Sequence, residues 1–370
     1  MRSYSETVSL SQAEKFAQAA GAGDEQKSPR GLNYYVRRIV TYLLCGYLCL
    51  CAALYLFQKR FIYHPHTEAS ISPQDYGFGR SQAVAIETQS SDGVTLKGWH
   101  VAGRAQADRE IMSLDLSKAV LVDLFFCGNG GNRADRSATF RRIMGEDVHT
   151  VCFDYRGYGD SGGSPSEEGL ARDARAAWDF LILKGVPPKR IVIHGESLGG
   201  AVAIRLASEL CAEGATPGGL ITEATFPRLS TIAARQFPLV PVSLLLTEKF
   251  PSIERIGKVT CPILMLHGAQ DELVPLSAGR ELFAAAPEQS ATMSRKEFVQ
   301  LPTSGHNNMG EADAMEYRQA LRMFYTKICP DLVITRDPNA KETKQKAREE
   351  RKTPKDGSRR SKTKPAPPAN

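Results

Sequence analysis

Near the N-terminus, the hydrophobic pattern contains one long apolar run without interruption. Residues 39–57 carry no charged side chain, whereas Arg37 and Arg38 precede them and Lys59 and Arg60 follow. A helix rises about 1.5 Å per residue, so this run spans about 28 Å, close to the roughly 30 Å of a bilayer's hydrocarbon core. A cleaved signal peptide places its apolar run nearer the first residue. The pattern therefore predicts a single transmembrane anchor over residues 39–57.

The charges around this run predict its orientation. Four basic residues lie close to the N-terminal end of the run, namely Lys27, Arg30, Arg37 and Arg38. Only two, Lys59 and Arg60, lie close to its C-terminal end. Because basic flanks stay on the cytoplasmic side, we expect a type II single-pass protein with a cytoplasmic N-terminus. Residues 1–38 are polar and rich in small side chains, so we expect them to form a flexible arm.

Beyond residue 82, the apolar positions alternate between two periods. Short apolar runs bounded by turn residues predict eight strands, at Ala83–Glu87, Val94–His100, Ala119–Phe126, Thr150–Asp154, Arg190–His194, Leu220–Glu223, Ile263–His267 and Glu297–Leu301. Helical periodicity lies between the later strands, at Ala134–Met144, Glu167–Leu183, Leu198–Cys211, Leu276–Ala285 and Ala312–Tyr325. This order predicts an α/β fold with a mostly parallel eight-stranded sheet and helices on both faces. Residues 225–258 interrupt it with prolines and short helical pieces, which predicts a small cap insertion.

Composition and charge narrow the class of protein. The chain of 370 residues can bury a sizeable core, which excludes a disulfide miniprotein. Residues 336–370 contain 12 Lys or Arg and 5 Asp or Glu, a local charge of +7, so the rest of the +6 chain sums to −1. A basic nucleic-acid-binding core is therefore excluded. We expect this tail to be disordered, and contact with anionic lipid headgroups is its alternative role.

The eight cysteines form no Cys-x-x-Cys pair and no cluster with histidine. This pattern argues against a structural zinc site and against a disulfide framework. We expect most of them to be free thiols, and we expect no metal ion.

The sharpest chemical signal is Gly195-Glu196-Ser197-Leu198-Gly199. An apolar run predicted as a strand precedes this motif, and a predicted helix follows it. Strand, tight turn and helix form the geometry of a nucleophile elbow, which projects the hydroxyl of Ser197 from the turn. The backbone N–H of Leu198 would then face a developing oxyanion. The alternative is a glycine-rich turn with an incidental serine.

A serine hydroxyl needs a base, and the base needs a carboxylate that orients it. His306 is the sole histidine beyond the strand at 263–267, and it lies in a loop after the last strand. Asp271 follows the strand at 263–267, so the order Ser, Asp, His is that of a nucleophile-elbow hydrolase. Glu272 is adjacent, but an apolar stretch begins directly after it. Asp271 and His306 are therefore the predicted partners of Ser197.

The second part of an oxyanion hole is expected after an earlier strand. The strand ending at Phe126 is followed by Cys127-Gly-Asn-Gly-Gly-Asn132. A glycine run offers backbone N–H groups without obstruction by side chains. Asn129 or Gly130 is the predicted donor. The alternative is a plain strand–helix turn.

Together with Asp154-Tyr-Arg-Gly-Tyr-Gly-Asp-Ser-Gly-Gly163, these motifs resemble the α/β-hydrolase family. Within that family, the chain resembles a membrane-anchored subgroup that includes α/β-hydrolase domain-containing protein 13 and related depalmitoylases. Gln58-Lys-Arg-Phe-Ile-Tyr-His-Pro65, directly after the apolar run, resembles the start of that subgroup. The similarity covers roughly residues 36–328. One departure is Cys127, since the subgroup usually has His-Gly-Asn at the oxyanion loop.

The resemblance implies an α/β-hydrolase domain over residues 58–330. It also implies hydrolysis of an acyl ester or thioester bond without metal or organic cofactor, on a lipid or an S-acylated protein. Serine at the elbow argues against the haloalkane and epoxide branches of the fold, which use aspartate there. The rival hypothesis is a non-catalytic scaffold of the same fold that tethers partners at a membrane. The intact Ser-Asp-His order favours the enzyme, and the Cys127 departure favours the scaffold.

Overall fold

The computed structural model describes residues 31–104 and 115–332. The chain divides into two compact units, Met1–Leu56 and Phe57–Asn370, which are described separately. The greater part of the predicted N-terminal arm and all of the predicted tail at 336–370 lie outside the described residues.

The long apolar run forms the middle of helix α2 (Leu32–Ile62). Among the described residues, it is the one helix long and apolar enough to cross a membrane. Only 6% of its most apolar stretch is buried, whereas the core helix of a soluble protein would be mostly buried. The helix begins at Leu32, so residues 32–38 are helical and the prediction that they belong to a flexible arm is wrong.

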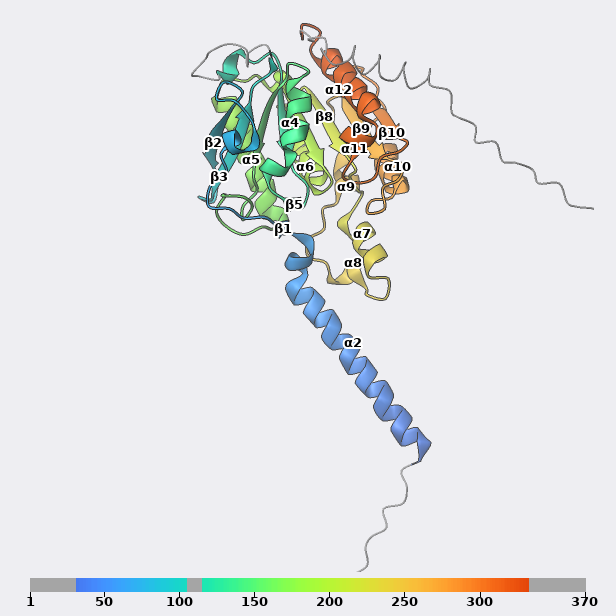
Figure 1. Cartoon of the computed structure of the whole chain (residues 1–370). Helices are drawn as coiled ribbons and strands as arrows, with labels where there is room; N and C mark the ends of the chain where they lie inside the picture. The colour runs from blue at the N-terminus through green and yellow to red at the C-terminus, as the bar shows by residue number, and fades with distance from the viewer. Residues whose placement is uncertain (1–30, 105–114, 333–370) are drawn as a thin grey trace, which may run out of the picture. The chain divides into compact units, whose positions relative to one another are not determined.

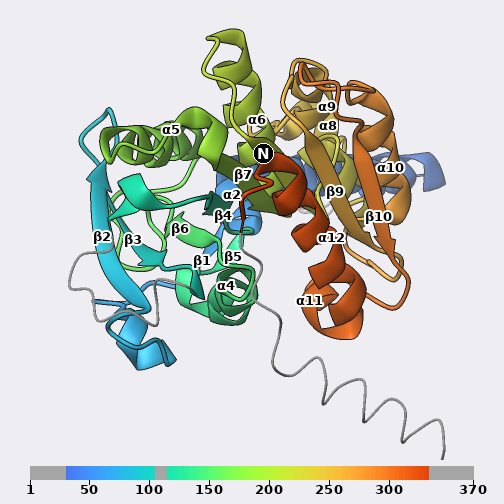
Figure 2. The same ribbon diagram turned by 90° about the horizontal axis from the view of Figure 1, so that it is seen from above.

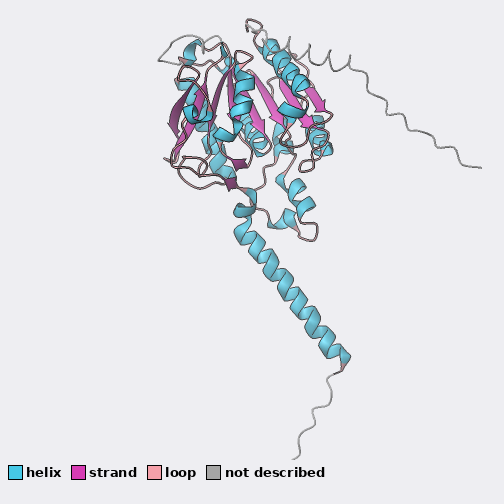
Figure 3. Ribbon diagram, viewed as in Figure 1, coloured by secondary structure: helices cyan, strands magenta, loops and turns pink. Residues whose placement is uncertain are grey.

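The second unit is built on an eight-stranded sheet with the order β10-β9-β8-β7-β4-β6-β3-β2 (Figures 1 and 3). Its strands are β2 (Ala83–Gln89), β3 (Thr95–Val101), β4 (Val122–Phe126), β6 (His149–Phe153), β7 (Ile191–Glu196), β8 (Gly219–Glu223), β9 (Ile263–Gly268) and β10 (Glu297–Leu301). Strand β3 pairs antiparallel with β2 and with β6, and all other neighbours are parallel. All eight strands coincide with predicted ones. A small parallel pair, β1 (His64–Pro65) and β5 (Gly130–Gly131), lies beside the sheet.

Helices cover both faces of the sheet, as Figure 2 shows. Outside the predicted cap, the longer ones are α4 (Ser137–Met144), α5 (Glu167–Leu183), α6 (Leu198–Ala212), α10 (Leu276–Ala285) and α12 (Ala314–Ile328). The short helix α11 (Met309–Ala312) precedes α12, and 3-10 turns lie at Pro73–Tyr76, Leu116–Lys118, Arg133–Arg136 and Pro188–Arg190. Buried side chains of α5, α6 and α10 share one hydrophobic core. Those of α4 and α12 share a second core on the opposite face. Because both faces are covered, the parallel strands β4, β7 and β9 are mostly apolar.

The predicted cap insertion at 225–258 contains α7 (Leu229–Gln236), α8 (Val242–Leu245) and α9 (Ser252–Ile256). Helix α9 is not a cap element, because Ile256 is buried in the same core as α6 and α10. Of these three helices, only α7 and α8 lie beyond the sheet edge at which β1 and β5 lie (Figure 1). We use the name cap for residues 229–247.

Candidate active site

Ser197 lies in a strained turn between β7 and α6. Its φ of 53° and ψ of −114° are unusual for a residue with a side chain. A Cβ on Gly195 would lie 2.2 Å from the carbonyl oxygen of Gly199, and one on Gly199 would lie 2.1 Å from that of Phe126. Both positions therefore require glycine, which is the physical reason for the Gly-x-Ser-x-Gly pattern.

The structure brings Ser197, His306 and Asp271 together from three separate loops. Nε2 of His306 lies 3.0 Å from Oγ of Ser197. Nδ1 of the same imidazole lies 2.8 Å from Oδ2 of Asp271. The three side chains follow β7, β9 and β10, whose parallel pairing places their carboxyl ends at one edge of the sheet.

The carboxylate of Asp271 is itself held in place. Its Oδ1 accepts hydrogen bonds from the backbone N–H groups of Leu273 (3.0 Å) and Val274 (2.8 Å). Oδ2 is thereby left for the imidazole of His306. Glu272, in contrast, is exposed.

His267 is close to this group but takes a packing role. Its Nε2 lies 2.9 Å from the carbonyl oxygen of Val274, in the same turn. Burial lowers the pKa of this imidazole below its ordinary value, so it stays neutral at pH 7. His267 is therefore a buried histidine whose hydrogen bond is satisfied within the turn.

The loop after β4 is anchored by its backbone. The hydroxyl of Tyr155 donates to the carbonyl oxygen of Cys127 (3.0 Å), and the hydroxyl of Tyr158 donates to that of Asn129 (2.8 Å). The N–H of His64 also donates to Asn129 O, and the Asn129 side chain donates to Ile62 O over 2.9 Å. The motif that contains both tyrosines indicated a family resemblance, but nothing in the sequence showed that their hydroxyl groups hold this loop.

The side chain of Cys127 points away from the loop into the core. It is buried, and its Sγ lies 3.5 Å from Sγ of Cys152. Burial raises the pKa of the Cys152 thiol well above its ordinary value, so this thiol is protonated at neutral pH. Because carbonyl groups and tyrosines hold the loop, replacement of the family histidine by Cys127 leaves it anchored.

The two glycines of β5 have different steric roles. A Cβ on Gly130 would meet nothing within 4 Å, whereas Gly131 has a φ of 80° and its Cβ would lie 2.1 Å from Oδ2 of Asp135. That carboxylate closes a capping box with Asn132 at the start of the following 3-10 turn. The steric need for glycine therefore lies at Gly131, not at the predicted donor Gly130.

A buried charged network lies behind the elbow, on β7 and its two neighbours. His194 Nδ1 lies 2.9 Å from Oδ2 of Asp123 on β4, and its Nε2 lies 2.8 Å from Oε1 of Glu223 on β8. Burial alone would lower the pKa of the imidazole, but the two carboxylates outweigh it and raise the pKa to about 10. Tyr317 and Tyr325 donate to the same two carboxylates. No motif in the sequence indicates this network, because its members come from three different strands.

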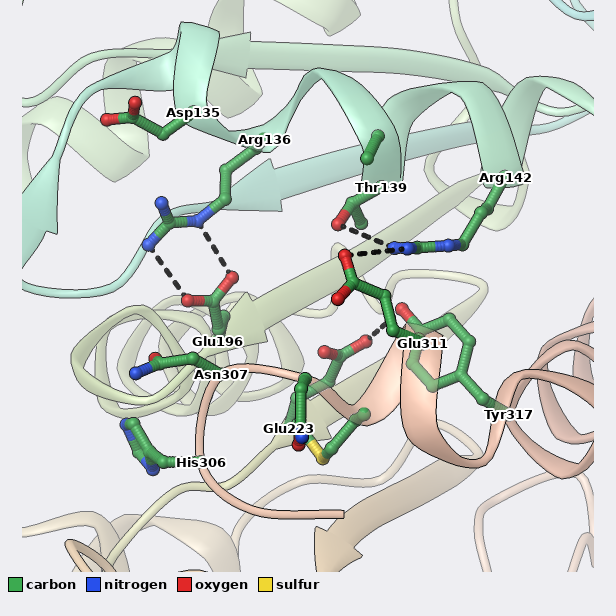
Figure 4. Close-up of a pocket in the computed structure, with 14 residues that line it drawn as sticks. Asp135, Arg136, Thr139, Arg142, Glu196, Glu223, His306, Asn307, Glu311 and Tyr317 are labelled. Carbon is green, nitrogen blue, oxygen red and sulfur yellow. Dashed lines mark hydrogen bonds and ion pairs between the residues drawn. The ribbon is translucent and has the colours of Figure 1, made fainter.

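A polar pocket of about 190 Å³ borders the imidazole of His306 (Figure 4). The Arg136 guanidinium forms two hydrogen bonds of 2.9 Å with the carboxylate of Glu196, next to Ser197 in sequence. Arg142 lies 3.6 Å from Glu311 across the same pocket. Because paired charges dominate its lining, this pocket is unsuited to an acyl chain.

The chain is similar in sequence to known proteins. A model of the alpha/beta hydrolase family matches residues 124–251. An uncharacterized protein of Mycobacterium tuberculosis is 37% identical over 280 residues, which covers 73% of this chain and 88% of the relative. Lysophosphatidylserine lipase ABHD12 of Danio rerio is 30% identical over 305 residues, which covers 74% of this chain and 79% of the lipase. The protein of the same name from Macaca fascicularis is 29% identical over 352 residues, covering 85% and 86%.

Solved structures show the same fold. The Pyrococcus furiosus esterase Pf2001 superposes with a TM-score of 0.54 at 17% identity, over 72% of this chain and 97% of the esterase. An alpha-beta hydrolase from Vibrio vulnificus gives a TM-score of 0.53 at 21% identity, over 70% and 96% of the two chains. At these identities the likeness concerns the fold alone.

The sheet order and the elbow between β7 and α6 are those of the α/β-fold hydrolases. The chain belongs to the alpha/beta hydrolase family. The predicted family, fold and ester-hydrolase class are thereby confirmed. The finer resemblance to the subgroup of α/β-hydrolase domain-containing protein 13 stays a prediction.

Proposed function

We propose that this chain is a membrane-anchored serine hydrolase that cleaves acyl ester or thioester bonds through Ser197, His306 and Asp271. The observation that carries the proposal is a chain of two hydrogen bonds. One joins Ser197 Oγ to His306 Nε2 (3.0 Å), and the other joins His306 Nδ1 to Asp271 Oδ2 (2.8 Å). Hydroxyl, imidazole and carboxylate in this order make up the machinery of acyl transfer.

The chemistry follows from the role of each group. Ser197 Oγ attacks the acyl carbonyl carbon while His306 Nε2 takes the hydroxyl proton. Asp271 keeps the other proton on Nδ1 and stabilises the imidazolium that forms. His306 then gives its proton to the departing alcohol or thiol, and the acyl group stays on Ser197. Water, activated by the same imidazole, attacks this acyl-enzyme, and release of the carboxylic acid restores the free hydroxyl.

The negative charge on the carbonyl oxygen needs backbone donors. The N–H of Leu198 is the first of helix α6, so it has no acceptor within the helix and coincides with the positive end of the helix dipole. Asn129 or Gly130 would supply the second N–H from the loop after β4. Anchoring of both carbonyl groups flanking Gly128 keeps this loop preorganised.

For the substrate we propose a lipid-like acyl ester, with an S-acyl thioester as the variant of the same chemistry. Two curated relatives are named lysophosphatidylserine lipases, and that name describes a single-chain lipid ester as substrate. Helix α2, with a charge-free run of residues 39–57, supports a single membrane span. The excess of basic residues before the run supports a cytoplasmic N-terminus.

Labelling of the full chain with a fluorophosphonate probe tests the proposal. We expect labelling of the wild type and of Ser277→Ala, a control at an exposed serine on α10. Ser197→Ala should not be labelled, and its turnover of a soluble ester should fall by at least about 10³-fold. Equal labelling of the wild type and Ser197→Ala would overturn the nucleophile assignment. A folded wild type that neither labels nor turns over esters would favour the scaffold.

A further inference from the structure

The cap carries two of the most exposed large apolar side chains of the described residues. Leu239 and Leu244 are 84% and 82% exposed, in the segment that joins α7 to the end of α8. Phe61 is also exposed, and its ring makes an edge-to-face contact with that of Phe237 at a centroid separation of 6.4 Å. Apolar side chains gathered on one exposed segment indicate a contact surface.

The cap is tied to the end of the predicted membrane span. Gln58, the first residue beyond the apolar run, is only 8% exposed. Its Oε1 accepts from the N–H of Thr247 (2.8 Å) and its Nε2 donates to the carbonyl oxygen of Leu245 (3.3 Å). Nζ of Lys59 lies 3.7 Å from Oε1 of Glu248, which follows Thr247 in the chain. The C-terminal end of α8 is therefore held at the level of Gln58.

This link fixes the depth of the cap. Each leaflet's headgroup region is roughly 5–8 Å thick, which is about the helical rise of the four steps from Gln58 to Ile62. If residues 39–57 span the hydrocarbon core, groups bonded to Gln58 lie where acyl chains meet headgroups. Charge agrees with this depth, because residues 57–63 and the cap (229–247) together contain three Lys or Arg and no Asp or Glu, a net charge of +3.

We propose that the cap rests in the headgroup–acyl boundary of the same bilayer that α2 crosses, with Leu239 and Leu244 among the acyl chains. This inference rests on the proposed anchor. It also assigns a route to the substrate, because the junction residue Ile62 accepts a hydrogen bond from Asn129 in the oxyanion loop. The cap, residues 58–62 and the oxyanion loop are therefore linked by direct hydrogen bonds, and we expect the acyl chain to approach Ser197 from this side.

Tryptophan quenching measures the depth directly. The two native tryptophans, Trp99 and Trp178, are buried, so a tryptophan placed at Leu244 is the one that lipid can reach. The full-length Leu244→Trp variant is reconstituted in phosphatidylcholine vesicles whose acyl chains carry bromine near the headgroup. We expect the emission of the added tryptophan to fall about twofold relative to unbrominated vesicles, because interfacial segments lie about 5–10 Å deep. Leu239→Trp should behave alike.

Leu183→Trp is the matched control. Leu183 is 87% exposed at the end of α5, and α5 runs back from the carboxyl edge of the sheet, so this residue lies at the edge opposite the cap. It should not be quenched. Vesicle flotation separates the two proposals: protein that does not float overturns the anchor and the cap contact together. Floated Leu244→Trp protein, quenched no more than Leu183→Trp, overturns the cap contact alone. Cross-linking of two copies through this position would overturn it in favour of a protein partner.

Activity provides a second readout. Leu244→Asp should lower turnover of a monoacyl phospholipid in vesicles several-fold while turnover of the soluble ester p-nitrophenyl butyrate stays near wild type. Leu183→Asp should change neither rate. Equal loss on both substrates, or no loss on the vesicle substrate, would contradict the proposed route.

Discussion

The backbone N–H of Ser197 donates a hydrogen bond to the carbonyl oxygen of Glu223 over 2.8 Å. The side chain of Glu223 binds the imidazole of His194, three residues before Ser197 on β7. Both contacts arise because Glu196 and Glu223 are register partners in neighbouring strands. The position of the nucleophile therefore depends on the sheet and on a charged group buried behind it.

Removal of Glu223 should destabilise the fold strongly. Glu223→Ala leaves the buried cation of His194 with one carboxylate, and we expect a loss of about 3–5 kcal/mol in the free energy of unfolding. Glu209→Ala, which removes an exposed partner of Arg205 on α6, should cost about 1 kcal/mol or less. Urea denaturation of both variants compares them. Similar small losses would show that the buried network contributes little.

The same network predicts a pH dependence of stability. The pKa of His194 is raised from its ordinary 6.5 to about 10 in the folded protein. Its contribution to stability is therefore fully present below pH 6.5 and is lost as the pH rises through about 10. The stability difference between wild type and His194→Gln should shrink over this interval, as measured by urea denaturation at several pH values. A difference that grows with pH would contradict the raised pKa.

Asp271 and Glu272 form a natural pair for testing the orienting carboxylate. Asp271→Asn should lower kcat by about 10³–10⁴-fold, because an amide favours the wrong tautomer of the imidazole. Its melting temperature should stay near that of the wild type. Glu272→Gln, at the exposed neighbour, should leave kcat unchanged. Steady-state turnover of a soluble ester distinguishes the two, and a larger effect at Glu272 would transfer the role to it.

Gly131 and Gly130 should respond differently to the addition of one methyl group. Gly131→Ala forces a Cβ into Asp135 at a positive φ, so we expect a loss of stability of about 1–3 kcal/mol. Gly130→Ala should leave stability within about 0.5 kcal/mol of wild type, since its Cβ meets open space. Thermal melts measure both. Any loss of turnover by a stably folded Gly130→Ala would indicate that the added methyl group occupies space that the substrate needs.

Two charges in the apolar run should remove the anchor. Each arginine at the centre of a membrane helix costs roughly 2.5–3.5 kcal/mol, so we expect Leu44→Arg combined with Leu48→Arg to abolish insertion. Sodium carbonate extraction should leave the wild type in the membrane pellet and release the double variant. Leu183→Arg, at an exposed surface leucine, should remain in the pellet. Extraction of the wild type itself would refute the anchor.

The local pattern of apolar and turn residues was sufficient to predict most strands and helices of this fold. All eight strands, and helices such as Glu167–Leu183 and Leu276–Ala285, occur where apolar periodicity places them. Ser197, Asp271 and His306 could be predicted as one group because turn residues mark the end of each strand, and the elbow pattern follows from local sterics at Gly195 and Gly199. Short-range backbone preferences and side-chain burial depend on a few neighbouring residues, so they can be inferred from the sequence alone.

Tertiary structure alone decided the contacts between distant segments. Nothing near Gln58 in the sequence indicates that it binds Thr247, and nothing near Asn129 indicates that Tyr158 and Ile62 hold it. The pairing of His194 with Asp123 likewise depends on strand order, because β4 lies beside β7 in the sheet although β6 comes between them in the chain. Such contacts depend on which elements become neighbours when the sheet assembles, and this is a property of the whole chain rather than of any segment.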